Sequence, residues 1–372
     1  MRIVHVNTEP TWRGGESQVF NLMLGLRRLG HESEAVTLPS SALWNRCREE
    51  SIPAFELNMR ADIDLIAAAK LADHLKDRPC DVLNAQTSRA HAIALLARKL
   101  GLRTPLVVTR RLDFPIRRYP TNLWKYRSKL VDRYIAVADV IRDILAETGV
   151  QQERITVINS SIDLRRFADV PDTRDGLRAE LGMPEDALIV GNVAALAWHK
   201  GQKDLIAAMP EVTRAVPRAW CVIVGEGDER ESLERLVRDA GGAARVILTG
   251  HRDDVPRILK AIDVFCMPSY YEGLCNSVLE AFAMKLPVVA ARAGGLPEIV
   301  SDGTTGLLVP AHDPRSLAEG IKKLLTDASL AQRLAAGGHR LACERFGVDL
   351  MVERTLDLYT RLLAGRAKAA RR

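Results

Sequence analysis

Two glutamates, Glu272 and Glu280, stand eight positions apart in the stretch SYYEGLCNSVLEAF, residues 269–282. An apolar, strand-like run precedes the stretch, and its second half has the apolar spacing of a helix. The helix start between Gly273 and Asn276 would offer free backbone N–H groups and the positive end of the helix dipole, which suit a phosphate. A carboxylate further along, such as Glu280, can accept two hydrogen bonds from a ribose diol. The stretch could therefore hold both ends of a nucleotide sugar, although the spacing alone also fits two unrelated surface acids.

Two lysines follow the first strand-like run of the second half of the chain. In WHKGQKDL, residues 198–205, Lys200 stands beside Gly201, where a turn into a helix is expected. A lysine at such a turn could neutralise the charge of a diphosphate. Lys203 could do so instead, or both lysines could be solvated surface residues.

A Gly-Gly turn also follows the first strand-like run of the chain. The stretch TWRGGES, residues 11–17, contains Gly14, Gly15 and Glu16. Glycine lets the backbone come close to a ligand because it has no Cβ. The stretch does not read G-x-G-x-x-G, so the dinucleotide-binding fingerprint is absent. The turn is therefore a candidate ligand contact and no more than that when taken alone.

Short apolar runs alternate with helical patterns along the chain, and Gly or Pro follows nearly every run. Such alternation implies parallel sheets covered by helices. The sequence therefore predicts an α/β fold of two doubly wound, Rossmann-like domains facing a central cleft. The predicted strands are at residues 2–7, 32–38, 81–86, 105–110 and 133–138 in the first half, and 188–194, 220–227, 245–250, 263–269 and 287–295 in the second.

The predicted domain boundary lies in a polar segment with Pro and Gly, residues 159–186, which we interpret as an interdomain linker. Residues 1–165 form the first predicted domain and residues 166–349 the second. An amphipathic helix at about 350–372 is expected to pack back on the first domain. A length of 372 residues suits two domains.

Composition excludes several classes of protein. The six cysteines show no C-x-x-C spacing, which argues against a zinc site and a disulfide framework. No stretch approaches the roughly 20 apolar residues of a membrane span, and the N-terminus lacks the apolar core of a signal peptide. We therefore expect a cytoplasmic protein, with peripheral contact to the inner face of the membrane left open.

The net charge of +6 arises entirely in the first half, because residues 1–165 hold 25 Lys and Arg against 19 Asp and Glu, and the rest holds 28 of each. Part of this excess lies in RRLDFPIRRYPTNLWKYRSK, residues 110–129, where aromatic residues are interleaved with basic ones. Three interpretations stay open for it: contact with anionic lipid, binding of an anionic acceptor, or a solvated face with core aromatics. Nucleic acid is not expected, because no nucleic-acid-binding module is recognised.

Several stretches in the second half, taken in order, resemble the retaining glycosyltransferases of the GT-B fold, family 4, also called the glycosyltransferase group 1 family. The E-x7-E signature corresponds to Glu272 and Glu280. The resemblance covers nearly the whole chain. The other matching segments are HKGQKDLIAA, VGEGDERESLERL, LTGHRDDVPRILKAIDVFCMPS and GLPEIVSDGTTGLLVP.

The resemblance implies that the second domain binds a nucleoside-diphosphate sugar. By this analogy Glu280 holds the ribose and Glu272 lies against the donor sugar. The amides of Gly273 and Leu274 face the sugar or the phosphate, and Lys200 counters the diphosphate.

The same resemblance implies further contacts. Arg252 would lie near the base, and Asn276 would belong to the donor site. The Gly14–Gly15 turn would approach the donor phosphate and the acceptor, and Glu16 is a candidate on the acceptor or phosphate side. No cofactor or metal is required, because lysine and the helix dipole neutralise the charge.

Two positions depart from the family pattern. The arginine that usually stands five residues before the lysine of the KG segment is replaced by Ala195. Where many members have a histidine after the strand at 105–110, this chain has Arg110, Arg111 and Asp113. A catalytic histidine therefore cannot be carried over, and these residues are candidates for phosphate or acceptor contact.

The expected activity is transfer of a sugar from a UDP- or GDP-sugar to a glycan or lipid-linked acceptor with retention of configuration, in cell-envelope polysaccharide or lipopolysaccharide synthesis. Glu272 and Lys200 are the expected catalytic residues. Two alternatives are a nucleotide-sugar epimerase of the same fold and a non-catalytic sugar-nucleotide binding protein. The sequence names neither the sugar and base nor the acceptor and oligomeric state.

Overall fold

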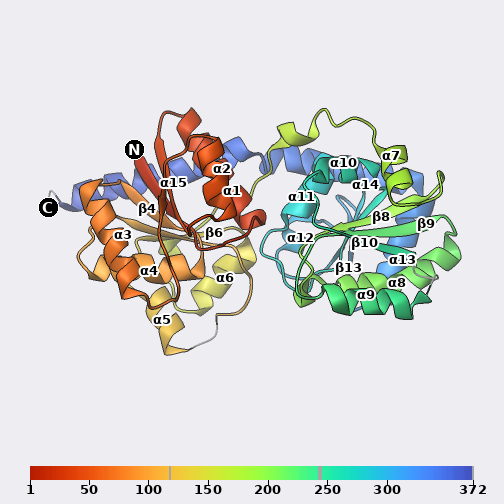
Figure 1. Cartoon of the computed structure of the whole chain (residues 1–372), viewed down its shortest axis with the longest axis horizontal. Coiled ribbons are helices and arrows are strands. Elements are labelled where there is room, and N and C mark those ends of the chain that lie inside the picture. The colour runs from red at the N-terminus through yellow and green to blue at the C-terminus, as the bar shows by residue number, and fades with distance from the viewer. Residues whose placement is uncertain (117–118, 242–244, 371–372) are drawn as a thin grey trace. The chain divides into compact units, whose positions relative to one another are not determined.

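The computed structural model describes residues 1–116, 119–241 and 245–370 and divides into two compact units (Figure 1). Unit 1 comprises residues 1–161 and 348–372, and unit 2 comprises residues 162–347. The chain therefore leaves unit 1 for unit 2 slightly earlier than the predicted boundary at 165/166. It returns to unit 1 for its last helix.

Unit 1 is built on a parallel sheet whose described strands have the order β3-β2-β1-β4-β5-β6-β7. The central strands are apolar and buried on both faces, as helix-covered parallel strands require. The strands are β1 (Arg2–Val6), β2 (Glu32–Thr37), β3 (Ala54–Glu56), β4 (Val82–Ala85), β5 (Leu106–Arg110), β6 (Arg133–Ala136) and β7 (Ile155–Val157). The helices are α1 (Gly14–Arg28), α2 (Ala42–Glu49), α3 (Leu65–Asp77), α4 (Ser88–Lys99), α5 (Pro120–Tyr126), α6 (Asp139–Glu147) and α15 (Val348–Ala370), with a 3-10 turn η1 (Gln152–Arg154).

Unit 2 holds a second parallel sheet of order β10-β9-β8-β11-β12-β13. Its strands are β8 (Leu188–Val193), β9 (Ala219–Val224), β10 (Val246–Gly250), β11 (Val264–Met267), β12 (Val288–Ala291) and β13 (Leu307–Val309). Its helices are α7 (Arg174–Glu180), α8 (Gln202–Ala215), α9 (Arg230–Asp239), α10 (Val255–Ala261), α11 (Asn276–Ala283), α12 (Leu296–Ile299), α13 (Pro314–Thr326) and α14 (Ala328–Arg345), with 3-10 turns η2 (Leu164–Phe167) and η3 (Trp198–Lys200).

Both sheets reverse their strand order once. In unit 1 the reversal lies between β1 and β4, and in unit 2 between β8 and β11. Ligands of doubly wound folds bind beyond the carboxyl ends of the strands at this reversal. The turns after β1, β8 and β11 are therefore where a site is expected, and they carry the Gly14–Gly15 turn, Lys200 and Glu272.

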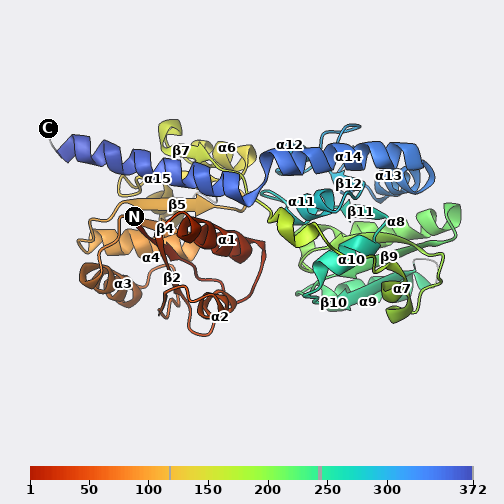
Figure 2. The ribbon, with the colours of Figure 1, turned by 90° about the horizontal axis from the view of Figure 1, so that it is seen from above.

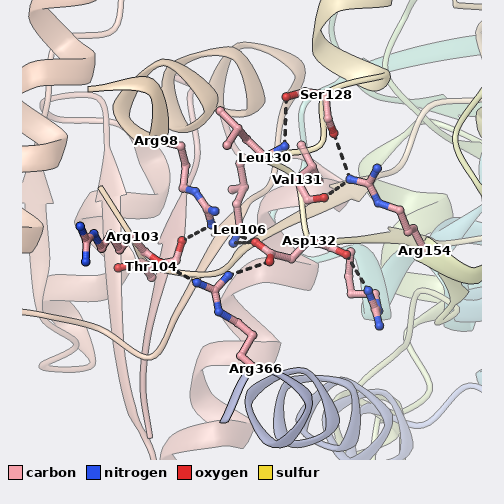
Figure 3. A network of polar contacts seen from close by, with 11 residues as sticks. Arg98, Arg103, Thr104, Leu106, Ser128, Leu130, Val131, Asp132, Arg154 and Arg366 are labelled. Carbon is pink, nitrogen blue, oxygen red and sulfur yellow. Dashed lines mark hydrogen bonds and ion pairs between the residues drawn. The ribbon is translucent and has the colours of Figure 1, made fainter. Parts of the chain in front are cut away.

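The helix predicted at about 350–372 is α15, which packs against unit 1 and runs along its sheet (Figure 2). The carboxylate of Asp132 holds its far end, because it accepts hydrogen bonds from Arg366 Nη1 at 2.8 Å, Arg98 Nη1 at 2.9 Å and the Leu106 amide at 2.9 Å (Figure 3). The buried Tyr359 hydroxyl accepts a hydrogen bond from Asn84 Nδ2 at 2.6 Å. These contacts make α15 part of the unit 1 core.

The interpretation of residues 159–186 as a linker is wrong, because most of this segment is part of unit 2. Leu177 in α7 is fully buried, and Arg178 Nη2 donates a hydrogen bond to the Ala187 carbonyl at 2.6 Å. Thr173 Oγ1 donates to the Arg257 carbonyl at 2.7 Å. The segment lacks long periodicity because it is two short turns of helix, each packed through a few residues.

The segment 110–129 is only partly a surface. Lys125 is buried, and its ammonium donates hydrogen bonds to Asp62 at 2.8 Å and to Ser88 at 2.9 Å. Leu112 and Tyr119 are each 58% exposed. Two of the basic residues of this segment, Arg117 and Arg118, are outside the described residues. Within the described ranges, no helix is long and apolar enough to cross a bilayer.

Candidate functional site

The strand reversal of unit 2 brings Lys200 and Glu272 into direct contact. Lys200 Nζ lies 2.5 Å from Glu272 Oε1, and Ser269 Oγ donates a hydrogen bond to the same oxygen at 3.1 Å. Glu272 is 8% exposed. A buried carboxylate needs such partners, because an uncompensated charge in the interior costs several kcal/mol. The carboxylate of Glu272 is thus held beside the ammonium group of Lys200, a residue 72 positions earlier in the chain.

Gly201 explains how the turn after β8 reaches the end of β11. Its φ of 69° lies in the left-handed region, and it precedes the first residue of α8. A Cβ at this position would lie 2.1 Å from the Pro268 carbonyl oxygen. Only glycine therefore permits this approach. The glycine of the KG segment thus sets the position of Lys200 against the strand that leads to Glu272.

Backbone hydrogen bonds join the turns at this edge of the sheet. The Tyr270 amide donates to the His199 carbonyl at 2.7 Å, and the Gly295 amide donates to the Glu272 carbonyl at 2.8 Å. The turns after β8, β11 and β12 are therefore one bonded assembly. The sequence does not predict these hydrogen bonds, because they join segments that are far apart in the chain.

Helix α11 begins at Asn276, close to the predicted start, so Glu272 lies in the loop and Glu280 in the second turn. The N-cap residue of this helix, Cys275, makes no side-chain capping hydrogen bond. Gly273 and Leu274 are buried in the loop just before it. The first turn of a helix leaves backbone N–H groups without intrahelical acceptors. This end of α11 therefore has the geometry expected of an anion contact.

Glu280 is partly buried on α11, and burial raises the pKa of its carboxyl group to about 7. The positive charge of Arg166, on the turn η2, opposes this rise. Among the described residues, none donates a hydrogen bond to the Glu280 carboxylate. The carboxylate thus keeps its acceptor capacity for a ligand. No sequence motif marks Arg166, so its position near Glu280 is known only from the structure.

Arg252 follows β10 and is engaged by two carboxylates of unit 2. Its Nε and Nη2 each donate to Asp254 at 2.8 Å, and its Nη1 donates to Glu180. These hydrogen bonds raise the pKa of the Arg252 guanidinium. Arg252 therefore anchors α7 beside α10. A contact with the base stays a prediction.

Ala195, at the position of the usual family arginine, lies in the turn after β8. Its carbonyl accepts a hydrogen bond from Gln202 Nε2 at 2.9 Å. Lys203, the alternative to Lys200 for neutralising the diphosphate, extends over the ring of Tyr270, with 5.6 Å from Nζ to the ring centroid. Within unit 2, Lys203 therefore does not join the pair formed by Lys200 and Glu272.

In unit 1, Gly14 and Gly15 open α1 after β1, and Glu16 is buried in its first turn. Asn7 Nδ2 donates to Glu16 Oε1 at 3.0 Å, and the Arg13 amide approaches Oε2 at 3.2 Å. Burial raises the pKa of the Glu16 carboxyl group. Both carboxylate oxygens thus serve the turn itself, which argues for a positioning role of Glu16.

The two arginines after β5 differ in their environment. Arg110 Nη1 donates to the Tyr126 hydroxyl at 2.7 Å, and its Nη2 donates to the Phe114 carbonyl at 2.6 Å. In Arg111, Nε and Nη1 are buried and no described residue accepts a hydrogen bond from them. Burial lowers the pKa of Arg111 to about 10. Asp113 is buried.

Arg111 also lies beside the Gly-Gly turn. A Cβ on Gly15 would sit 3.5 Å from Arg111 Cδ. Arg111 lines a small cavity of about 20 Å³ with Gln18, Thr109 and Asn159. Unit 1 therefore brings together Gly15, Glu16 and Arg111, whereas Arg110 is held by its own segment.

Comparisons with known proteins place the chain in a family. The family model described as "Glycosyl transferases group 1" matches residues 173–340, and "Glycosyltransferase Family 4" matches residues 12–166. The lipopolysaccharide core biosynthesis glycosyltransferase LpsE of Rhizobium meliloti is 30% identical over 95% of this chain and 96% of its own length. LpsD of the same organism is 28% identical over 98% of this chain and 100% of its own length.

Among solved structures, Anabaena HepE in complex with UDP and glucose has a TM-score of 0.86 with 22% identity, covering 97% of this chain and 100% of that one. A likeness at this identity supports the fold alone. The full-length match to LpsE supports the family as well. The chain therefore belongs to the glycosyltransferase group 1 family, family 4, and is a glycosyltransferase of the GT-B fold.

Proposed function

We propose that the protein transfers a sugar from a nucleoside-diphosphate sugar to a glycan or lipid-linked acceptor, with retention of the anomeric configuration. The observation that carries the proposal is the pair Lys200–Glu272 at the strand reversal of unit 2, followed on α11 by Glu280. These groups supply a cation for the diphosphate, a fixed carboxylate for the sugar and a carboxylate acceptor for the ribose diol.

In the proposed reaction, the bond between the anomeric carbon and the diphosphate oxygen breaks. Lys200 and the first-turn amides of α11 stabilise the charge that develops on the diphosphate. The acceptor hydroxyl oxygen bonds to the anomeric carbon on the same face, and its proton passes to the departing phosphate. Glu272, held by Lys200 and Ser269, positions the sugar and is not assigned as the nucleophile. The proposal includes no metal or cofactor.

The names of the relatives narrow the candidates. LpsE and LpsD are named for lipopolysaccharide core biosynthesis, and HepE was solved with UDP and glucose. We therefore take a UDP-sugar as the first donor to test, with GDP-sugars second. Cell-envelope glycans, lipopolysaccharide core among them, are the first acceptors.

A thermal-shift panel of UDP- and GDP-sugars tests the donor, because a ligand that binds only the folded protein raises its melting temperature. The best donor is then incubated with candidate acceptors, and the anomeric configuration of the product is read by NMR. Glu280→Ala should weaken donor binding, and Lys200→Ala should slow transfer. Wild-type kinetics in both variants, or an epimerised donor formed without acceptor, would contradict the proposal.

We further propose that the enzyme acts at the cytoplasmic face of the membrane, with the exposed part of segment 110–129 against lipid. Leu112 and Tyr119 are large apolar side chains of that part that are exposed. Cosedimentation with vesicles containing anionic lipid measures this contact. The double variant Leu112→Ser, Tyr119→Ser should bind less, and equal binding by the variant would refute the assignment.

A further inference from the structure

Unit 2 contains a pocket of about 300 Å³ among the turns that precede α8, α9 and α13. Helices α8, α9 and α13 lie on one face of the second sheet (Figure 1). The volume is at the lower end of the range for small-molecule sites, roughly 300–1,000 Å³. The proposed donor residues are not among its lining. Its lining includes Trp198, Gln202, Lys203, Glu229, Tyr270 and His312.

One wall of the pocket is the ring of Tyr270, which is held from several sides. Its hydroxyl donates a hydrogen bond to Asp204 Oδ2 at 2.7 Å, and its ring stacks on His312 with 3.7 Å between centroids. His312 has a φ of 60°. A non-glycine residue adopts this left-handed conformation at a cost and keeps it only where its surroundings fix it. The aromatic wall is therefore preorganised.

The second aromatic group that lines the pocket is Trp198. Trp198 is 57% exposed, which is unusual for so large an apolar residue. It belongs to the same turn, η3, as Lys200. An exposed indole beside a preformed pocket offers a flat apolar platform to a ligand.

The polar groups of the pocket carry opposite charges. Lys203, on α8, supplies donors, and Glu229, just before α9, supplies acceptors. Gln202 also lines the pocket, with its Nε2 already donating to the Ala195 carbonyl. Lys203 would attract a phosphate or carboxylate, but Glu229 would repel it. A neutral polyol can form hydrogen bonds with both side chains. A pyranose has C–H groups on its faces and hydroxyl groups at its edge, so it matches an aromatic platform with mixed hydrogen-bonding partners.

We propose that this pocket binds a neutral hexopyranose unit of a glycan, apart from the donor residues. The inference rests on the proposed function, in which the acceptor or product is a glycan with units remote from the reacting hydroxyl. Binding of such a unit against Trp198 would add a contact to the turn that carries Lys200. Binding energy from a remote part of the substrate can in this way support the reacting centre.

Saturation-transfer NMR on the full chain tests the site with three probes, the methyl α-glycosides of glucose, galactose and mannose. At least one should bind, and UDP should not displace it. Trp198→Ala and Glu229→Ala should each weaken that binding at least about tenfold. Glu231→Ala is the matched control, because Glu231 is an exposed carboxylate on α9 that does not line the pocket, and it should bind as the wild type does.

Three results would overturn the inference: no binding of any of the three glycosides, displacement by UDP, or unchanged binding in both pocket variants. The thermal shift by the best nucleotide sugar is measured on the same samples. If a nucleotide sugar raises the melting temperature of the wild-type protein but no glycoside binds, this inference alone is refuted. If no nucleotide sugar raises that melting temperature, the proposed function itself is refuted. Should Trp198→Ala fail to fold, Lys203→Gln takes its place beside Glu229→Ala, and it too should weaken glycoside binding.

Discussion

At the scale of single residues, Glu280 is a carboxyl group whose charge depends on pH near neutrality. Burial raises its pKa to about 7, from an ordinary 4.5. Because the folded protein holds this proton more tightly than the unfolded chain, the group's contribution to stability is fully present below about pH 4.5. That contribution is lost as the pH rises through about 7.

Donor binding should have the opposite dependence on pH. A ribose diol donates hydrogen bonds to the ionised carboxylate, so affinity for a nucleoside-diphosphate sugar should rise about tenfold between pH 6 and pH 8. Calorimetric titration across this range measures the change. Glu280→Gln should remove the dependence on pH, and a dependence that persists in this variant would show that another group titrates.

Arg110 and Arg111 should behave differently despite being neighbours. Arg111→Gln removes a guanidinium whose Nε and Nη1 are buried without described partners, so it should lower kcat/KM about 10–100-fold. Its melting temperature should change little. Arg110→Gln should instead lower the melting temperature, because it removes hydrogen bonds to Tyr126 and Phe114. The reverse pattern would contradict our reading of this pair.

At the scale of elements, Gly201 tests the approach of the turn after β8 to the end of β11. In Gly201→Ala, the left-handed φ and the contact with the Pro268 carbonyl should both destabilise unit 2 and displace Lys200. Gly182→Ala is the matched control, since Gly182 has a φ of 64° and open space around its Cβ position.

The control should cost about 1–2 kcal/mol, and Gly201→Ala clearly more, with loss of transfer. Calorimetric melting and initial rates measure both effects. Equal losses of stability in the two variants would show that the close contact is unimportant.

The sequence revealed the main strands and the loop position of Glu272 because apolar runs and Gly turns are local signals. The short strands β3, β7 and β13 were not predicted, because three residues are too few to show an apolar pattern. Two interactions of the site involve residues that are far apart in the sequence. They are the ion pair between Lys200 and Glu272 and the electrostatic effect of Arg166 on Glu280. Such contacts follow from the fold of the sheet and have no local signature.

At the scale of the whole molecule, the last helix, α15, packs against the first helix, α1. A Cβ on Gly25 of α1 would lie 2.3 Å from Val352 Cγ2 of α15. Gly25→Ala should therefore separate the two helices and destabilise unit 1 by about 1–3 kcal/mol. Gly365→Ala, a helical glycine with nothing near its Cβ position, should stabilise slightly. Melting followed by hydrogen exchange assigns the change to a unit, and a loss confined to unit 2 would contradict the prediction.

The discontinuous make-up of unit 1 has a consequence for synthesis on the ribosome. Its first 161 residues emerge early, but the helix that covers their apolar face is translated only after all of unit 2. At about 5–20 residues per second, this face stays uncovered for many seconds. The nascent first unit therefore needs shielding, and a ribosome that stops before residue 348 releases a chain whose second unit can be complete while its first cannot.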